Sequence, residues 1–285
     1  MDNFNWKEFY ERCDQFICDW YKDPEGCALD SIYLKASNNK KSFLYKQRCF
    51  MPEPFLGNPE GCLAVMLNLN PADPMEKFCY KDSYARQIIS EGYSKRAKEF
   101  SIFEEGDGGS KWWGQRIYWL NRISGNRDEN LKPFVVEICP WHSKKWGRLD
   151  YEKGELVETI KSNTLEPAFS AVHNAKISNC VIAIGKDYCE VLSELGFKEE
   201  VRFMPSSGNL EVFVNGSKNL EKGDYWSACE RWPRNKKQEL SNRAFTVFSK
   251  GENRILCIWS NKGGSNKPPQ EGFDTLVKAL IEGSY

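Results

Sequence analysis

Four short apolar runs, widely spaced along the chain, constrain its fold more than any other feature. They are Cys62 to Leu67, Phe134 to Ile138, Cys180 to Ile184, and Ile255 to Trp259. Apart from Glu137 these runs are apolar, and short apolar runs are typical of strands covered on both faces. Helix-like stretches separate them, which favours a sheet whose strands are joined by helical crossovers.

The segments around these runs carry the periodicity of amphipathic helices. Apolar side chains recur every three or four residues from Trp6 to Trp20 and from Phe273 to Ile281. Further helices are expected over Tyr84–Phe100, Trp112–Ile123, Glu155–Asn174, where Pro167 can break the helix, and Asp187–Leu195. The sequence therefore predicts an α/β protein, a three-layer α/β/α sandwich around a mainly parallel, four-stranded central sheet.

Residues 201–249 depart from this alternation of strands and helices. Within them, Glu211–Val214 followed by Asn215-Gly216 indicates a β-hairpin, because Asn-Gly suits a two-residue turn. We expect residues 1–60 to form a helical extension packed on the core. Residues 61–285 would then form one α/β/α domain, with an inserted hairpin region at about 201–249.

Charge, cysteines and hydropathy limit the partners of the chain. Its 40 lysines and arginines balance 40 aspartates and glutamates, so nucleic-acid binding would need a local basic patch. The 11 cysteines lack the spacing of zinc or cluster ligands, and we expect neither a metal nor another cofactor. No apolar stretch approaches the roughly 20 residues of a membrane span. The N-terminal residues do not resemble a signal peptide, so a cytoplasmic protein is expected; the oligomeric state stays open.

A polar loop follows each apolar run. Asn68 to Pro74 follow the first run, Cys139 to Ser143 the second, Gly185 to Asp187 the third, and Ser260 to Pro269 the fourth. The carboxyl ends of parallel strands meet at one edge of a sheet. We therefore expect a shared cleft lined by amides, hydroxyls and His142.

The same residues also have plain structural explanations. Asn and Asp beside Pro71 and Pro74 are ordinary turn formers, although these prolines would also hold Asn70 rigidly over the end of the strand. His142 could be a satisfied structural residue of its loop. Gly263 and Gly264 could mark only a tight turn.

Three motifs resemble those of the uracil-DNA glycosylase superfamily, most closely its branch of mismatch-specific uracil and thymine glycosylases. They are Asn70-Pro71-Ala72 after the first run, the strand Val181–Gly185, and the turn Ser260–Ser265 before the last helix. The resemblance covers roughly Gly61–Tyr285 in layout, and short motifs carry it. It implies a hydrolase that cleaves the N-glycosidic bond of a flipped DNA base.

The resemblance assigns a role to each candidate residue. Asn70 would orient the attacking water, with Asp73 as the alternative activator, and His142 or the amides of the glycine-rich turn would donate to the leaving base. Residues expected to bind the base, by stacking or hydrogen bonding, are Phe78, Tyr80, Glu137, Ser143, Ser260, Asn261, Gly263, Gly264 and Ser265. Residues expected to contact the nucleic-acid backbone are Lys144, Lys145, Arg148 and Lys262. Without such contacts, these lysines and arginines would form a solvated charged surface.

The sequence departs from the superfamily pattern in two ways. Members that recognise uracil place an Asn in the second core strand, where this chain has Glu137, so the substrate stays open. The cysteine set of the iron–sulfur branches is also absent, so no cluster is expected. One alternative is a non-catalytic nucleic-acid or nucleotide binding protein of the same fold. Another is a hydrolase of a small nucleoside-like metabolite, which the neutral charge favours. The sequence has no phosphate-loop, dinucleotide-loop or nucleophile-elbow motif. It therefore gives no sign of nucleoside triphosphate hydrolysis, dinucleotide binding or serine-hydrolase chemistry, the commonest alternatives for an α/β protein.

Overall fold

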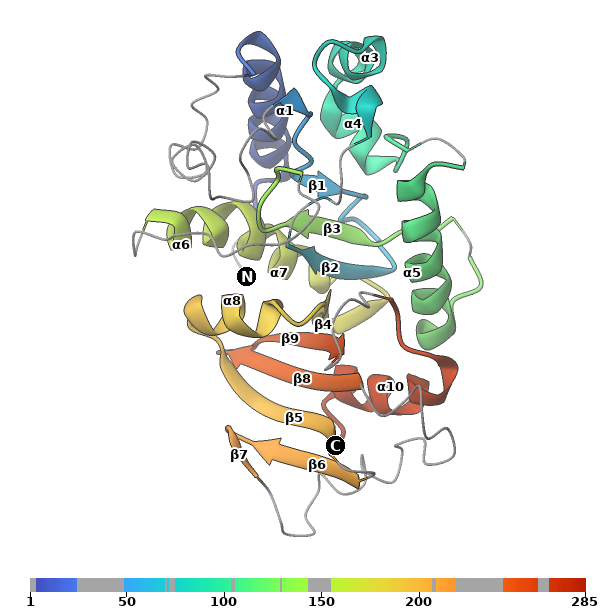
Figure 1. The fold of residues 1–285 in the computed structure, drawn as a ribbon, viewed down its shortest axis with the longest axis vertical. Coiled ribbons are helices and arrows are strands. Elements are labelled where there is room, and N and C mark those ends of the chain that lie inside the picture. The colour runs from blue at the N-terminus through green and yellow to red at the C-terminus, as the bar shows by residue number, and fades with distance from the viewer. Residues whose placement is uncertain are drawn as a thin grey trace. The chain divides into compact units, whose positions relative to one another are not determined.

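The computed structural model (Figure 1) describes residues 4–24, 49–69, 71, 75–103, 106–128, 130–142, 155–206, 209–218, 243–260 and 267–285. Its strands are β1 (Phe55–Leu56), β2 (Ala64–Asn68), β3 (Phe134–Glu137), β4 (Ile177–Ile184), β5 (Lys198–Ser206), β6 (Asn209–Val214), β7 (Ser217–Lys218), β8 (Arg243–Lys250) and β9 (Asn253–Ser260). Its α-helices are α1 (Trp6–Lys22), α3 (Ser83–Glu91), α4 (Tyr93–Lys98), α5 (Gly108–Ser124), α6 (Glu155–Ile160), α7 (Glu166–Val172), α8 (Tyr188–Glu194) and α10 (Asp274–Glu282). Shorter turns are the 3-10 segments η2 (Glu76–Phe78) and η5 (Glu271–Phe273) and the π-helical segment η3 (Lys161–Leu165).

The fold is mixed α/β, but the predicted four-stranded, mainly parallel sheet is wrong. Over the described residues the sheet has nine strands, in the order β1-β3-β2-β4-β9-β8-β5-β6-β7. The four apolar runs do form strands: β2, β3, β4 and β9. Strands β4 and β9 pair in parallel, whereas β8 pairs antiparallel with both β9 and β5. Strand β5 was missed because buried residues such as Val201 and Phe203 alternate with half-buried ones, so no continuous apolar run marks it.

The chain divides into two compact units, and each is built from segments that are not continuous in sequence. Unit 1 comprises Met1–Asn58, Leu67–Glu104 and Phe134–Ala171. Unit 2 comprises Pro59–Met66, Glu105–Pro133 and Val172–Tyr285. The single domain predicted from residue 61 onward stays a prediction, and the two units are described separately below.

Helix α1 packs on unit 1 through one apolar face. Asn5 caps its first turn by accepting a hydrogen bond from the Glu8 amide at 3.2 Å. The buried face consists of Phe9, Cys13, Ile17 and Trp20. The Phe9 ring lies 5.3 Å from that of Phe55 in β1, so aromatic contacts fix the helix beside the strand.

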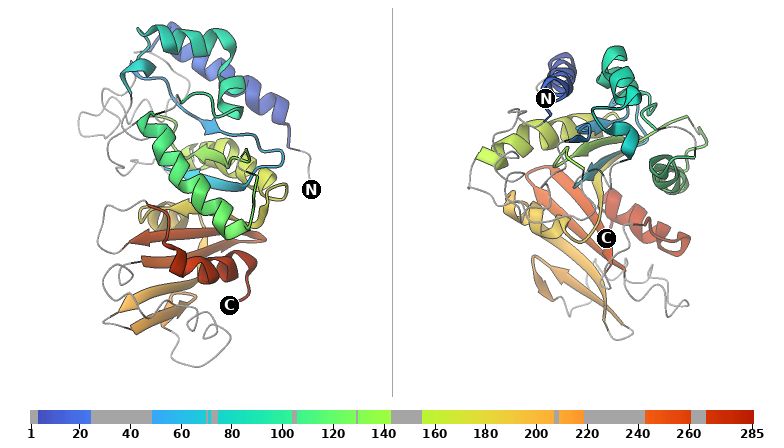
Figure 2. Two further views of the ribbon diagram at one scale, coloured as in Figure 1. Left: turned by 90° about the vertical axis from the view of Figure 1, so that its right-hand side faces the viewer. Right: turned by 45° about the horizontal axis from the view of Figure 1, so that its top comes forward.

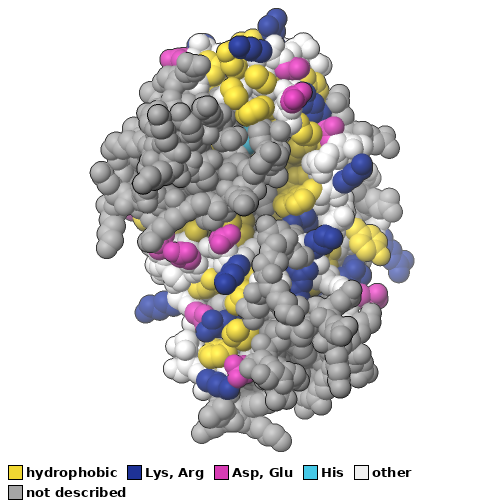
Figure 3. Space-filling model, in the orientation of Figure 1, with side chains coloured by type: hydrophobic (Ala, Val, Ile, Leu, Met, Phe, Trp, Pro, Cys, Tyr) yellow, Lys and Arg dark blue, Asp and Glu magenta, His cyan; other side chains and the backbone are white. Residues whose placement is uncertain are grey.

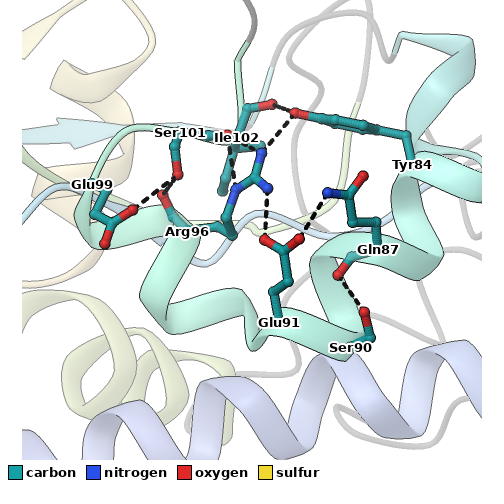
Figure 4. Close-up of polar contacts among 8 residues, drawn as sticks. All are labelled: Tyr84, Gln87, Ser90, Glu91, Arg96, Glu99, Ser101 and Ile102. Carbon is teal, nitrogen blue, oxygen red and sulfur yellow. Dashed lines mark hydrogen bonds and ion pairs between the residues drawn. The ribbon is translucent and has the colours of Figure 1, made fainter.

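The single helix predicted over Tyr84–Phe100 is two helices, because Gly92 between them has a φ of 89°. This left-handed conformation ends α3, and glycine adopts it without strain. Arg96 of α4 then holds the two helices together (Figure 4). Its guanidinium donates to Glu91 Oε2 at 2.8 Å and, through Nε, to the Ser101 carbonyl at 3.0 Å. It also donates to the Tyr84 hydroxyl, which in turn donates to the Ile102 carbonyl at 2.8 Å.

The helix predicted with a break at Pro167 continues through that residue by way of a π-helical turn. In a regular α-helix Pro167 would leave the Asn163 carbonyl without a donor, and its ring would crowd that carbonyl. The wider turn η3 relieves this conflict, and its hydrogen bond runs from the Glu166 amide to the Lys161 carbonyl. Helix α7 then follows directly. Such π-helical turns are frequent at functional sites.

Unit 2 contains most of the antiparallel part of the sheet. The predicted hairpin is confirmed: β6 pairs with β7, with Val214 opposite Ser217. Asn215 and Gly216 between them have φ angles of 49° and 77°, as a two-residue hairpin turn requires. Strands β5 and β8 pair along their length, so much of the predicted insertion is part of the sheet.

Helices α5 and α10 of unit 2 lie side by side (Figure 2) and are joined by a bidentate ion pair. Arg122 Nε lies 2.6 Å from Asp274 Oδ2, and Arg122 Nη2 lies 3.0 Å from Oδ1. Arg122 also donates to the Pro269 carbonyl at 3.2 Å. A forked guanidinium thus fixes both the start of α10 and the segment before it.

Replacing Arg96 with alanine should lower the free energy of unfolding by about 1–3 kcal/mol, because the Ser101 carbonyl and Glu91 would lose their charged donor. Arg96→Lys keeps the charge but not the fork, so a smaller loss is expected. Urea unfolding followed by tryptophan fluorescence measures both variants.

The control is Lys95→Ala, which removes a neighbouring exposed cation and should change stability by no more than about 0.5 kcal/mol. Equal losses for Arg96→Ala and Lys95→Ala would show that the contacts in Figure 4 do not stabilise the helix pair.

Candidate functional site

Two of the predicted strand ends meet in unit 1. Asn68 is the last residue of β2, Glu137 is the last residue of β3, and Asn68 Nδ2 donates to Glu137 Oε1 at 2.9 Å. The backbones stay together beyond the strands, since the Ile138 amide donates to the Asn68 carbonyl at 2.8 Å. A carboxyl and an amide are therefore held against each other at this edge of the sheet.

A second carboxyl, Glu53, is brought to the same place by the segment that leads into β1. The Glu137 amide donates to the Pro54 carbonyl at 3.1 Å, and the Glu53 amide donates to the Pro140 carbonyl at 2.8 Å. Glu53 Oε1 lies 3.2 Å from His142 Nε2, and both side chains are almost fully buried. The histidine of the second polar loop thus faces a carboxylate rather than solvent.

Burial controls the charge of Glu137. Its side chain is only 4% exposed, and Oε2 has no hydrogen-bond partner among the described residues. Desolvation raises the pKa of this carboxyl well above its usual range; the Asn68 hydrogen bond opposes the shift and the charge of Glu53 adds to it. Glu137 therefore favours the neutral, protonated form, which offers an O–H donor beside a carbonyl acceptor.

A pocket of about 580 Å³ lies in unit 1, with Glu137 among its lining residues. The other lining residues are Glu8, Phe9, Glu11, Arg12, Cys13, Gln15 and Phe16 of α1, Pro54, Ile138, Pro140, and Asn163 and Thr164 of η3. Its volume falls within the range of roughly 300–1,000 Å³ that is usual for small-molecule sites. Thr164 Oγ1 donates to the Glu137 carbonyl at 2.9 Å, so the π-helical turn is tied to the end of β3.

The predicted stacking residues have different surroundings. Phe78 is fully buried, and its ring lies nearly parallel to that of His142, with centroids 6.1 Å apart and planes at 29°. Tyr80 is half-buried, and Lys81 Nζ lies 5.4 Å from its ring centroid. Phe78 therefore packs beside His142, whereas Tyr80 is more accessible.

Most of the other predicted site residues lie outside the described part of the chain. They are Asn70, Asp73, Ser143, Lys144, Lys145, Arg148, Asn261, Lys262, Gly263, Gly264 and Ser265. Ser260 is described as the last residue of β9, in unit 2. The predicted convergence of Asn70, His142 and Asn261 on one cleft stays a prediction.

Two residues of the site, Glu53 and Thr164, were missed by the sequence analysis. Asn68 was named only as part of the first polar loop, and it closes an apolar strand with a polar side chain, as Glu137 does. Glu53 lies between two prolines in an irregular segment, and Thr164 lies inside a helical stretch, so neither stands out in the sequence. Their roles follow from backbone pairing and from the π-helical turn.

Comparisons with known proteins identify no relative for this arrangement. No family model matches the chain, and neither a curated protein nor a solved structure shows significant similarity to it. In the described part of the chain, His, Cys, Asp and Glu side chains form no group of three or more that could hold a metal ion. No described helix is both long enough and apolar enough to cross a membrane. Function must therefore be argued from the site itself.

The raised pKa of Glu137 predicts a pH dependence of stability. A carboxyl whose folded-state pKa is raised stabilises the fold below its unfolded pKa, and this stabilisation is lost as pH rises through the folded pKa. Glu137→Gln keeps a neutral side chain at every pH. The variant should therefore gain stability relative to the parent protein as pH rises from 5 to 9, measured by urea unfolding.

Glu76→Gln, which changes an exposed carboxylate of unit 1, is the matched control and should follow the parent protein across this range. If Glu137→Gln also runs parallel to the parent protein at every pH, the neutral state assigned to Glu137 is incorrect.

Proposed function

We propose that the protein binds a nucleobase in unit 1 and hydrolyses the N-glycosidic bond that joins the base to its sugar. The observation that carries the proposal is Glu137, whose buried carboxyl has a raised pKa and which is among the residues that line a ligand-sized pocket. A neutral carboxyl presents a donor and an acceptor side by side, as an amide does, and base edges are recognised by such pairs. Glu137 occupies the position where the resembling superfamily has its base-reading Asn.

Cleavage of an N-glycosidic bond needs a proton or hydrogen-bond donor for the departing base, which Glu137 can supply. As the bond breaks, the sugar gains positive charge and the base gains negative charge, which a donated proton or hydrogen bond stabilises. The protonated Glu137 acts as this donor, and Asn68 fixes its other oxygen at 2.9 Å. The attacking water is assigned to Asn70, with Asp73 as the alternative, and His142 stays a second donor candidate. The three-layer α/β/α arrangement and a cytoplasmic location belong to the same proposal.

Flipped DNA is the substrate that the sequence resemblance implies. Its backbone would contact Lys144, Lys145, Arg148 and Lys262. Figure 3 shows side chains of both charge signs on the described surface of the face drawn, and neither sign covers it. Affinity for DNA would therefore depend on the local cluster rather than on net charge.

A free nucleoside is the second candidate, and the wall of the pocket favours it. Helix α1 contributes Glu8, Glu11 and Arg12 to the lining, two acidic residues against one basic residue. A polyanion approaching this wall meets net negative charge, whereas a neutral nucleoside does not. The pocket volume of about 580 Å³ also exceeds what a base alone requires.

The test incubates the protein with oligonucleotides carrying uracil, hypoxanthine or mismatched thymine, and in parallel with free nucleosides. Alkaline strand scission reports base loss from DNA, and chromatography reports base released from nucleosides. Glu137→Gln should bind the accepted substrate but lose about 10²–10⁴-fold in turnover, because the amide keeps the hydrogen-bond pattern and cannot transfer a proton.

Glu11→Gln is the control, since it changes another carboxylate of the pocket lining and should retain turnover. Cleavage of oligonucleotides alone supports the DNA substrate, and cleavage of nucleosides alone supports the metabolite. Base release from neither panel, with Glu137→Gln and parent protein identical in binding, would overturn the proposal. Binding of DNA without cleavage would favour the non-catalytic alternative.

A further inference from the structure

Unit 2 has a pocket of its own, with a volume of about 220 Å³, and a thiol lies in its wall. The lining residues are Lys186, Asp187, Cys189, Glu190, Glu199, Arg202, Thr246 and Trp259. They come from the turn after β4, from α8, and from β5, β8 and β9. This pocket takes no part in the function proposed for unit 1.

A second thiol lies directly behind Cys189. Cys257 of β9 is fully buried in the middle of the sheet, opposite Ala183 of β4 and Thr246 of β8. The side chains of Cys189 and Cys257 lie close enough for each to shift the pKa of the other. One thiol thus reaches the pocket while its partner is enclosed by the sheet.

A short chain of donors ends on the Cys189 sulfur. Trp259 Nε1 donates to Thr246 Oγ1 at 3.1 Å, and the Thr246 side chain forms a hydrogen bond with Cys189. The Thr246 oxygen thus accepts from the indole N–H, and its side chain also stabilises the charged form of Cys189. Cys257 and Thr246 therefore both lower the pKa of Cys189.

The surroundings shift the pKa values of the two thiols in opposite directions. The hydrogen bond from Cys257 lowers the pKa of Cys189, with smaller contributions from Arg202 and Thr246 against desolvation and the charge of Glu199. Burial raises the pKa of Cys257 well above its usual range. The proton thus stays on Cys257, and Cys189 is the thiol that ionises first.

We propose that Cys189 is a peroxide-reactive thiol and that Cys257 is its resolving partner, so that unit 2 carries a redox site for small hydroperoxides. The pocket volume of about 220 Å³ admits hydrogen peroxide or a small organic hydroperoxide. Enclosure of Cys257 in the sheet leaves Cys189 as the thiol that peroxide meets first.

The reaction balances in two steps. The Cys189 thiolate attacks one peroxide oxygen, the O–O bond breaks, and the departing oxygen takes a proton to leave as water or an alcohol; sulfur becomes a sulfenic acid. The Cys257 sulfur then attacks the Cys189 sulfur, an S–S bond forms, and the hydroxyl leaves with the Cys257 proton as water. The hydroperoxide is the oxidant throughout.

The test treats the full-length protein with hydrogen peroxide, blocks the remaining thiols, and maps tryptic peptides without reduction. Cys189 and Cys257 are the only cysteines of tryptic peptides 187–198 and 255–262, so a linked pair is identified by mass. The linked pair should be the dominant oxidised species. Cys189 should be oxidised at least about tenfold faster than Cys18, a half-exposed thiol of α1.

Variants separate the two steps. Cys257→Ser should leave a sulfenic acid at Cys189 that dimedone traps, and Cys257→Ala serves if the serine does not fold. Cys189→Ser should abolish both products. The proposal is overturned if Cys189 in the parent protein is oxidised no faster than Cys18, or if Cys257 stays a free thiol once Cys189 is oxidised.

Discussion

The structure of unit 1 around the candidate site depends on burial of the Glu137 carboxyl at the end of a central strand. An ionised carboxylate with one hydrogen bond is strongly unfavourable at 4% exposure, so burial raises the pKa of this group and favours its neutral form. Asn68 satisfies one oxygen, while Thr164 and Pro54 fix the backbone on either side. Three segments far apart in sequence thus hold Glu137, one through its side chain and two through its backbone, and the site exists only where they meet.

Proline chemistry shapes the pocket as much as the carboxyl does. Pro167 removes one hydrogen bond from its helix, and the π-helical turn that results contributes Asn163 and Thr164 to the lining. The wall formed by α1 is a regular helix, and it contributes apolar side chains such as Phe9 and Phe16 beside the charged Glu8, Glu11 and Arg12. The irregular turn and the regular helix thus both place polar groups along the pocket, and α1 adds apolar surface as well.

The sequence predicted the parts of the fold that depend on local pattern. Four strands were found because each contains a short, mainly apolar run, and the hairpin was found because Asn215 and Gly216 suit positive φ angles. Strand β5 was missed because alternation with half-buried residues hides it, and the break at Gly92 because a helical pattern runs across it. At the site, Glu137 was identified from its strand end. Its pairing with Asn68, 69 residues away, and the contact between Glu53 and His142 come from tertiary structure and have no local signal.

The two candidate centres follow one physical rule with opposite results. Burial disfavours the charged form of any acid, and hydrogen-bond donors aimed at the charged form oppose that effect. Glu137 receives one side-chain donor, from Asn68, and desolvation dominates, so it favours the proton-donating form that an acid catalyst needs. At Cys189 the interactions with Cys257, Arg202 and Thr246 outweigh desolvation, so the pKa of this thiol is lowered, which is the direction that a nucleophile needs. Burial alone therefore does not set the pKa of either acid, because the donors around each group contribute as well.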